Sequence, residues 1–312
     1  DTVDLGGVGA GGVGLDITAG DVSFDAPVNV AGGADIENSG DLVIADGAGL
    51  STGGPATFSG TGPVTANAGI TTDGVEIRFA SELILSDDVT FDTGCGMAGD
   101  IVFESNVKGD YLLTLEAGTG DVHFLSTLGA GTMLSGVQVI CGAHVEFDGS
   151  VAVRNEGIDI TASDVTFHDT VDVLGTGTTT VDITGTLTVD EVTVDRPELQ
   201  LDGAFTQTGS GTVEMFGELL TTNDDISFAG VLTLGDNVAM DTGAGPGTLT
   251  FAGNVTGDFL LQLSAGAGDI DFDSPVGAST PLSGLVVTSA VNLTFDDTLA
   301  VDDDGVDITA GN

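Results

Sequence analysis

The chain has very few basic residues. Its 312 residues include 49 Asp or Glu, and the cations are limited to Lys108, Arg78, Arg154 and Arg196, so the formal net charge at pH 7 is −45. Binding to nucleic acid depends on contacts between Lys or Arg and phosphates. The composition therefore excludes nucleic acid as a partner, and it disfavours polyanionic substrates and anionic membrane surfaces for the same reason.

Cysteine is also scarce. Cys95 and Cys141 are too few for a disulfide scaffold. They stand in separate segments of the sequence, and a bridge between them cannot be assumed from sequence alone. Two buried thiols and one disulfide therefore remain equally open.

Long apolar runs are absent as well. No run approaches the ~18 residues of a membrane span, so we expect no membrane insertion. The first residue is Asp1 rather than Met, which indicates a processed chain or a segment of a longer one, and the near-absence of lysine favours an extracellular or cell-surface location. Asn254 and Asn292 stand in Asn-x-Thr patterns, which chance explains better than glycosylation.

Apolar residues and glycine are plentiful. The apolar fraction is 41%, the mean hydropathy is +0.32, and 50 residues are Gly. Disorder requires low hydrophobicity together with high charge, so we expect an ordered chain.

A long internal repeat occupies most of the chain. Residues 101–124, IVFESNVKGDYLLTLEAGTGDVHF, match residues 249–272, LTFAGNVTGDFLLQLSAGAGDIDF, at an offset of 148. The motif GIDITA at 157–162 recurs as GVDITA at 305–310. The expected divisions are a Gly-rich N-terminal segment (linker or inter-subunit contact) at 1–14, a first long repeat at 15–157, a second at 158–306, and the uncapped start of a further repeat at 307–312.

A shorter period of roughly 20–24 residues lies inside the long repeat, in the range typical of solenoid proteins. Segments that end in Phe recur along the chain, for example DIVF (100–103), DVHF (121–124) and HVEF (144–147). Their strict alternation places apolar residues on one face and polar residues on the other, and Gly-rich corners separate them.

This period predicts an all-β fold, a parallel β-solenoid (β-helix) of about 14 coils of roughly 20–24 residues. Each coil buries its apolar row only by stacking on its neighbours, so Phe above Phe should form one continuous ladder. The alternative is two tandem β-sandwich domains, which the long repeat permits but which have no reason to show the short period.

Residues 263–290, LSAGAGDIDFDSPVGASTPLSGLVVTSA, resemble the repeats of filamentous-haemagglutinin-type adhesins and giant bacterial surface proteins. The resemblance extends over essentially the whole chain after the Gly-rich opening, and it rests on Gly, Thr and alternating apolar residues. It implies a right-handed parallel β-helix that is exported and serves as a shaft or an adhesive surface.

Clustered carboxylates beside a glycine turn make Ca²⁺ the one candidate cofactor. Hard oxygen ligands suit this ion, and the motif DDDGVD supplies four of them, Asp302, Asp303, Asp304 and Asp307. The motif lacks the spacing of an EF-hand loop. Solvating surface charge is the alternative interpretation.

The three histidines invite a second metal hypothesis. His123, His144 and His168 follow one another at intervals close to the short period, so they could stack on adjacent coils as a row of ligands. Each stands an odd number of residues from its local Phe. All three should therefore point outward, and ordinary solvent-face residues are the favoured interpretation.

Paired aspartates could act as acid and base in polysaccharide hydrolysis. The pairs Asp87-Asp88, Asp224-Asp225 and Asp296-Asp297 are scattered along the chain, and the sequence identifies no cleft on which they converge. We therefore expect no catalytic residues and no enzyme.

The expected function is that of a structural extracellular protein, a subunit or segment of a head-to-tail β-solenoid filament or cell-surface shaft. Its partners would be copies of itself or neighbouring repeats of a longer chain, together with cations. One alternative is an adhesin-type module that binds glycans or cell surfaces. A second is a β-helix enzyme acting on polysaccharides.

Overall fold

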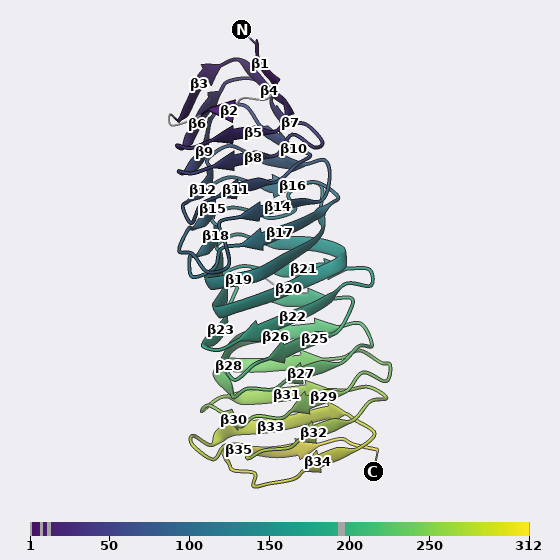
Figure 1. Cartoon of the computed structure of the whole chain (residues 1–312). Coiled ribbons are helices and arrows are strands. Elements are labelled where there is room, and N and C mark those ends of the chain that lie inside the picture. The colour runs from purple at the N-terminus through teal and green to yellow at the C-terminus, as the bar shows by residue number, and fades with distance from the viewer. Residues whose placement is uncertain (1, 7–8, 11–13, 193–196, 312) are drawn as a thin grey trace. The chain divides into compact units, whose positions relative to one another are not determined.

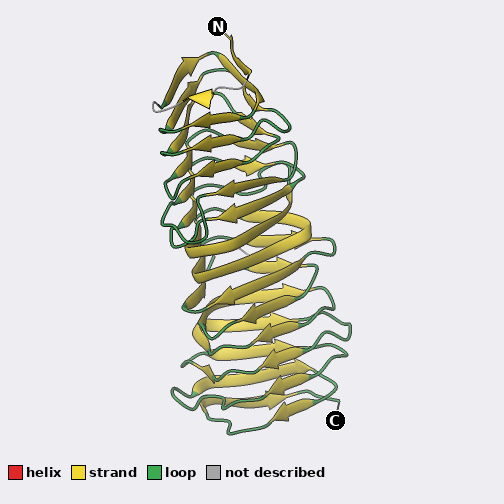
Figure 2. Ribbon diagram, in the orientation of Figure 1, coloured by secondary structure: helices red, strands yellow, loops and turns green. Residues whose placement is uncertain are grey.

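The computed structural model describes residues 2–6, 9–10, 14–192 and 197–311, with the backbone alone at 2–6, 9–10 and 303. This part of the chain contains strands and loops and no helix (Figure 2), and thus no helix able to cross a membrane. The strands stack in about 14 turns, and every described strand pair is parallel. The predicted β-solenoid is confirmed. The β-sandwich alternative is wrong, because sandwich sheets are antiparallel.

The chain divides into two compact units, one of Asp1–Glu156 with Ile160–Ala162 and one of Gly157–Asp159 with Ser163–Asn312. In each unit a coil contributes one strand to each of three faces. Figure 1 shows strands of one face in successive layers, such as β6, β9 and β12.

In the first unit the three faces are built by the following strands. The first face holds β3 (Leu15–Ala19), β6 (Ala34–Asn38), β9 (Ala56–Gly60), β12 (Ile77–Phe79), β15 (Ile101–Phe103), β18 (Val122–Phe124) and the end of β19 (Leu134–Phe147). The second holds β1 (Thr2–Gly6), β4 (Asp21–Ala26), β7 (Leu42–Ile44), β10 (Val64–Ala66), β13 (Leu83–Leu85) and β16 (Val107–Lys108). The third holds β2 (Gly9–Ala10), β5 (Val28–Val30), β8 (Leu50–Thr52), β11 (Ile70–Thr72), β14 (Val89–Asp92), β17 (Leu112–Glu116) and the start of β19. The chain then enters β20 (Val151–Phe167), whose residues belong to both units.

The second unit repeats this plan. Its first face holds β22 (Thr178–Ile183), β25 (Phe205–Thr208), β27 (Ile226–Phe228), β29 (Leu249–Phe251), β32 (Ile270–Phe272) and β34 (Leu293–Phe295). The second holds β23 (Thr186–Val189), β30 (Val255–Thr256) and the first halves of β26 (Thr212–Thr221) and β28 (Leu232–Asp241). The third holds β21 (Val171–Leu174), β24 (Leu199–Leu201), the second halves of β26 and β28, β31 (Leu260–Ser264), β33 (Leu282–Ser289) and β35 (Val301–Ile308).

Strict alternation explains why these short segments form strands around a core. In β15 and β18 the first and third residues are buried and the middle one is partly exposed. A coil of three such strands directs its apolar side chains inward, where they pack on the same positions of the coils above and below. Burying a large apolar side chain contributes about 1.5–3 kcal/mol, so the stacking itself supplies the stability of each unit.

The expected stacking of Phe above Phe is confirmed on the first face of each unit, but not every Phe of the recurring motif belongs to these ladders. In the first unit Phe79, Phe103 and Phe124 are register neighbours on the first face, and Phe103 and Phe124 stack with ring centroids 4.6 Å apart. Phe24, from the equivalent-looking motif DVSF, lies on the second face instead, where its register neighbour is Ile44. The same motif therefore occurs in strands of different faces, in β4 on the second face and in β15 and β18 on the first.

The two long repeats fold alike. Strands β15 to β18 begin at positions 101, 107, 112 and 122, and β29 to β32 begin at positions 249, 255, 260 and 270, so the offset of the sequence repeat is kept in every case. The corner glycines agree as well, since Gly109 has a φ of +127° and Gly257, its counterpart, a φ of +128°. A Cβ on Gly109 would lie 2.2 Å from the carbonyl oxygen of Leu85, so this corner requires glycine.

Candidate functional site

Many aspartates of the chain accept hydrogen bonds from the backbone of the next coil. Asp100 immediately precedes β15, and its Oδ1 accepts a hydrogen bond of 2.9 Å from the backbone N–H of Asp121, the residue that precedes β18 one coil later. Asp121 accepts from His144 N–H in the same way, at 3.1 Å. The second unit repeats the arrangement, because Asp225 accepts from Thr248 N–H at 2.7 Å and Asp269 from Asn292 N–H at 3.0 Å. The first residue of the recurring DxxF motif thus caps the next coil.

The aspartate pairs are used in a similar manner. Asp88 Oδ1 accepts from Leu112 N–H at 2.9 Å, and Asp87 Oδ1 accepts from Asp88 N–H at 2.8 Å. Asp297 Oδ1 accepts from Thr298 N–H at 2.7 Å. These are contacts with the protein backbone, and they give the carboxylates a conformational role. The expectation that the chain is not an enzyme stays a prediction.

The predicted calcium ligands lie on β35. Asp302, Asp304 and Asp307 are exposed there, and the side chain of Asp303 lies outside the described residues. Gly305, with a φ of +73°, lies within the strand between Asp304 and Asp307. Among the side chains that the structure describes, no three of this set bring their oxygens together around one point. The calcium site stays a prediction.

The three histidines lie on outward faces, as their spacing predicted, and each contacts an aspartate. His144 Nδ1 lies 2.8 Å from Asp121 Oδ1, and His168 Nδ1 lies 2.5 Å from Asp190 Oδ2. In each pair the two residues come from neighbouring coils. The histidines thus join coils through carboxylates.

His123 differs from the other two because two carboxylates meet its ring. Its Nε2 lies 3.1 Å from Asp148 Oδ2 and 3.4 Å from Glu146 Oε2. His123 is the middle residue of β18, and Glu146 is its register neighbour in β19. The ligand atoms of the three residues all lie within 4.8 Å of one another. One imidazole and two carboxylates are thus gathered on the outer surface of the first unit.

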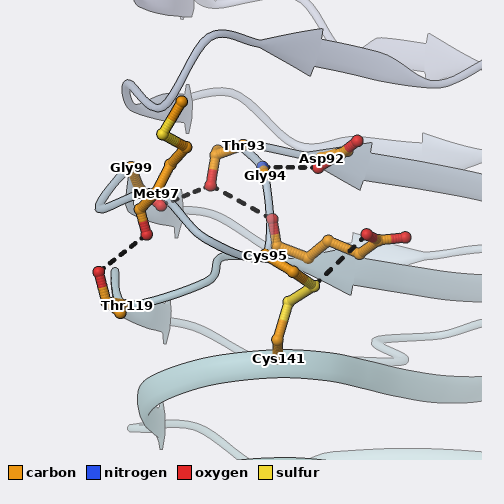
Figure 3. The surroundings of a disulfide bond; sticks show 9 residues. Asp92, Thr93, Gly94, Cys95, Met97, Gly99, Thr119 and Cys141 are labelled. Atoms are coloured by element: carbon orange, nitrogen blue, oxygen red, sulfur yellow. Dashed lines mark hydrogen bonds between the residues drawn. A yellow bond between two sulfur atoms is a disulfide. The ribbon is translucent and has the colours of Figure 1, made fainter.

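The two cysteines form a disulfide, which settles the alternatives that the sequence left open. Cys95 lies on the loop after β14, Cys141 lies on β19, and their Cα atoms are 5.8 Å apart (Figure 3). Glu116 Oε2 lies 3.5 Å from Cys95 Sγ. The bridge extends over the end of β17, so it holds three successive coils together.

Hydrogen bonds shape the loop that carries Cys95. Thr93 Oγ1 donates to the carbonyl of Gly99 at 2.7 Å, and Gly94 N–H donates to Asp92 Oδ1 at 2.6 Å. Thr119 Oγ1, from the next coil, donates to the carbonyl of Met97 at 2.9 Å (Figure 3). These contacts place Cys95 beside Cys141.

The terminal coil of the second unit exposes residues of the inward-facing row. Val306 and Ile308 of β35 are 47% and 45% exposed, whereas their register neighbours in β33, Leu285 and Val287, are 0% and 1% exposed. Phe295 of β34 is partly exposed, and Phe272, one coil earlier, is buried. β35 pairs with β33 along one edge, and no described strand pairs with its other edge. An apolar surface and an open strand edge therefore coincide.

The two glycosylation patterns lie in different surroundings. Asn292 is exposed, and its side-chain amide donates to Asp269 Oδ1 at 2.8 Å. Asn254 is partly buried and its carbonyl accepts from Leu232 N–H. Neither setting changes the interpretation of the two patterns as chance occurrences.

Sequence reasoning missed the capping aspartates and the group at His123. The signal for the first was the Asp that opens each DxxF motif, which alternation alone assigns to solvent. For the group at His123, the signal was the spacing along the chain: Glu146 is the register neighbour of His123 in the next coil, and Asp148 stands two residues further on.

Comparison with known proteins adds no assignment, since no family model, no curated protein and no solved structure matches the chain.

Proposed function

We propose that the chain is a structural, extracellular β-solenoid whose coils stack end to end on other coils of the same kind, in a filament or a cell-surface shaft. The terminal coil of the second unit carries the proposal. Its apolar residues are about half exposed, where the same positions one coil earlier are buried. A further coil placed on β34 and β35 would bury them and pair the open strand edge.

The repeat supports a coil of the same kind as the occupant, either from another copy of the chain or from neighbouring repeats of a longer chain. In the first copy GIDITA (157–162) leads, after six residues, into DTVDVLG (169–175). In the second copy the equivalent motif is GVDITA (305–310), and residues 1–7, DTVDLGG, resemble 169–175. Where the occupant is another copy, the contact joins unlike surfaces and does not close on itself, so it generates a fibre. The proposal also rests on the resemblance to filamentous-haemagglutinin-type repeats, which implies an exported β-helix that serves as a shaft.

The disulfide and the charge support the extracellular setting and a dependence on cations. Disulfides persist mainly in oxidising environments. A net charge of −45 opposes the approach of two copies, and this repulsion is screened by salt or by divalent cations such as Ca²⁺. We therefore expect assembly to increase with ionic strength.

Electron microscopy and sedimentation of the full chain over a range of NaCl and CaCl₂ concentrations test the proposal. The expected result is fibres that lengthen with salt and are lost in the Val306→Asp and Ile308→Asp variants. Leu125→Asp is the matched control, because Leu125 is 43% exposed but lies in the first unit at the corner after β18. A monomer of 30.9 kDa under every ionic condition would contradict self-assembly.

A further inference from the structure

We propose that His123, Glu146 and Asp148 form a binding site for a divalent transition-metal ion, with Zn²⁺ as the representative. The three ligand atoms come from two neighbouring coils, His123 from β18 and the carboxylates from β19 and the residue that follows it. One imidazole nitrogen and two carboxylate oxygens make a donor set that zinc accepts, with a fourth position left to water.

The two distances from the imidazole nitrogen fit such an ion. Zinc binds nitrogen and oxygen at about 2.0–2.2 Å, so the ligand atoms of a tetrahedral site are about 3.3–3.6 Å apart. His123 Nε2 lies 3.4 Å from Glu146 Oε2 and 3.1 Å from Asp148 Oδ2. Small side-chain rotations would complete the geometry.

A plain ion pair is the competing explanation, and the same face supplies an example of one. Arg78 of β12 contacts Glu104, which follows β15, along the diagonal that relates His123 to Asp148. Arginine is a permanent cation with no lone pair to offer a metal. Histidine has a ring nitrogen that binds metals when neutral, and at His123 a second carboxylate joins the first. This combination distinguishes the group from the Arg78 pair.

The second long repeat lacks the complete donor set. At the offset of the long repeat, Asp271 replaces His123 and Thr294 replaces Glu146, while Asp296 matches Asp148. Asp271 and Thr294 are register neighbours on β32 and β34, as His123 and Glu146 are on β18 and β19. The chain therefore contains its own comparison site, and we expect one zinc ion per chain.

Calorimetric titration of the full chain with ZnCl₂, in physiological NaCl and a millimolar excess of Mg²⁺ to occupy unspecific carboxylates, tests the site. The expected result is one equivalent bound, with a change in the imidazole resonances of His123 by NMR. His123→Gln and Asp148→Asn should each weaken binding at least tenfold or so, since losing even an indirect partner of a metal ligand costs about 10–100-fold.

His144→Gln is the matched control, because it removes an imidazole that contacts Asp121 and lies outside the group. Zinc binding that survives His123→Gln unchanged, or that Mg²⁺ displaces completely, would overturn the proposal. The double variant Asp271→His, Thr294→Glu adds the missing ligands beside Asp296 and should bind a second equivalent. If the double variant folded but bound only one equivalent of zinc, the claim that this arrangement of neighbouring coils creates the zinc site would be contradicted.

Discussion

At the scale of single residues, the acidic side chains have two distinguishable roles. Some, such as Asp302 and Asp304, are exposed on a strand surface and contribute charge. Others, such as Asp100 and Asp269, accept a backbone hydrogen bond from the next coil. The second group needs an acceptor oxygen at that position and does not need a negative charge, since the amide of Asn offers the same oxygen.

Asp100→Ala and Asp100→Asn separate these roles. Asp100→Ala removes the acceptor for Asp121 N–H, so the free energy of unfolding in urea should fall by about 0.5–1.5 kcal/mol. Asp100→Asn keeps the acceptor and removes one of 49 acidic charges, so its stability should equal or exceed that of the natural chain. If the Asn variant were as unstable as the Ala variant, the capping interpretation of Asp100 would be wrong.

At the scale of elements, the two long repeats share a corner loop that carries a disulfide in the first repeat and has no cysteine in the second. The corner after β14 carries the disulfide. In the second unit Asp241, Thr242 and Gly243 repeat its hydrogen bonds, with Thr242 Oγ1 donating to the carbonyl of Gly247 at 2.9 Å and Gly243 N–H to Asp241 Oδ1 at 2.7 Å. The residues at the cysteine positions are Ala244 and Ser289, which line one shallow depression with Gly266. The loop is one residue shorter than its counterpart.

This correspondence predicts that Ala244→Cys with Ser289→Cys forms a second disulfide. A bridge that closes a loop of this length typically stabilises a protein by about 2–4 kcal/mol. Part of this gain is offset, because Ser289 Oγ accepts from Gly266 N–H at 3.0 Å in the natural chain. Intact mass under oxidising and reducing conditions detects the bond, and thermal unfolding measures its effect.

The single variant Ser289→Cys is the control, since it loses the same serine contacts and gains no bridge. Two freely titrating thiols in the oxidised double variant would mean that the shorter loop holds the second corner in a different geometry.

At the scale of the whole molecule, the dominant feature is the large excess of acidic over basic side chains. The described ion pairs of the basic side chains are few, among them Lys108 with Glu82 at 2.8 Å. The remaining carboxylates repel one another, and self-repulsion disfavours a compact state. The apolar stacking of the coils offsets this repulsion.

The melting temperature should therefore rise by several degrees between about 20 mM and about 0.5 M NaCl, as the screening length falls from about 20 Å to a few ångströms. For units of this size about 1 kcal/mol corresponds to roughly 2–4 °C. Calorimetry measures the change, and sucrose at equal osmolality controls for effects unrelated to charge. A melting temperature that ignores salt would show that repulsion contributes little to the stability of the folded chain.

Much of this fold was predictable from local sequence. The short period and the alternation around residues such as Phe103 and Phe124 identified parallel coils, and the odd spacing of His123, His144 and His168 from Phe placed them outside. These properties are local, because the pleat of a strand alone decides which side chains face inward. The long repeat likewise predicted that distant segments fold alike, as β15 to β18 and β29 to β32 do.

Only the tertiary structure decided which residues meet between coils. That choice depends on how many residues each Gly-rich corner takes up, and a change of one or two residues moves a side chain to another neighbour. The structure placed Phe24 in a strand of the second face, brought Cys95 to Cys141 across an intervening coil, and set Glu146 and Asp148 beside the ring of His123. The sequence by itself determined the direction in which each side chain points, and the stacking of the coils determined what it contacts there.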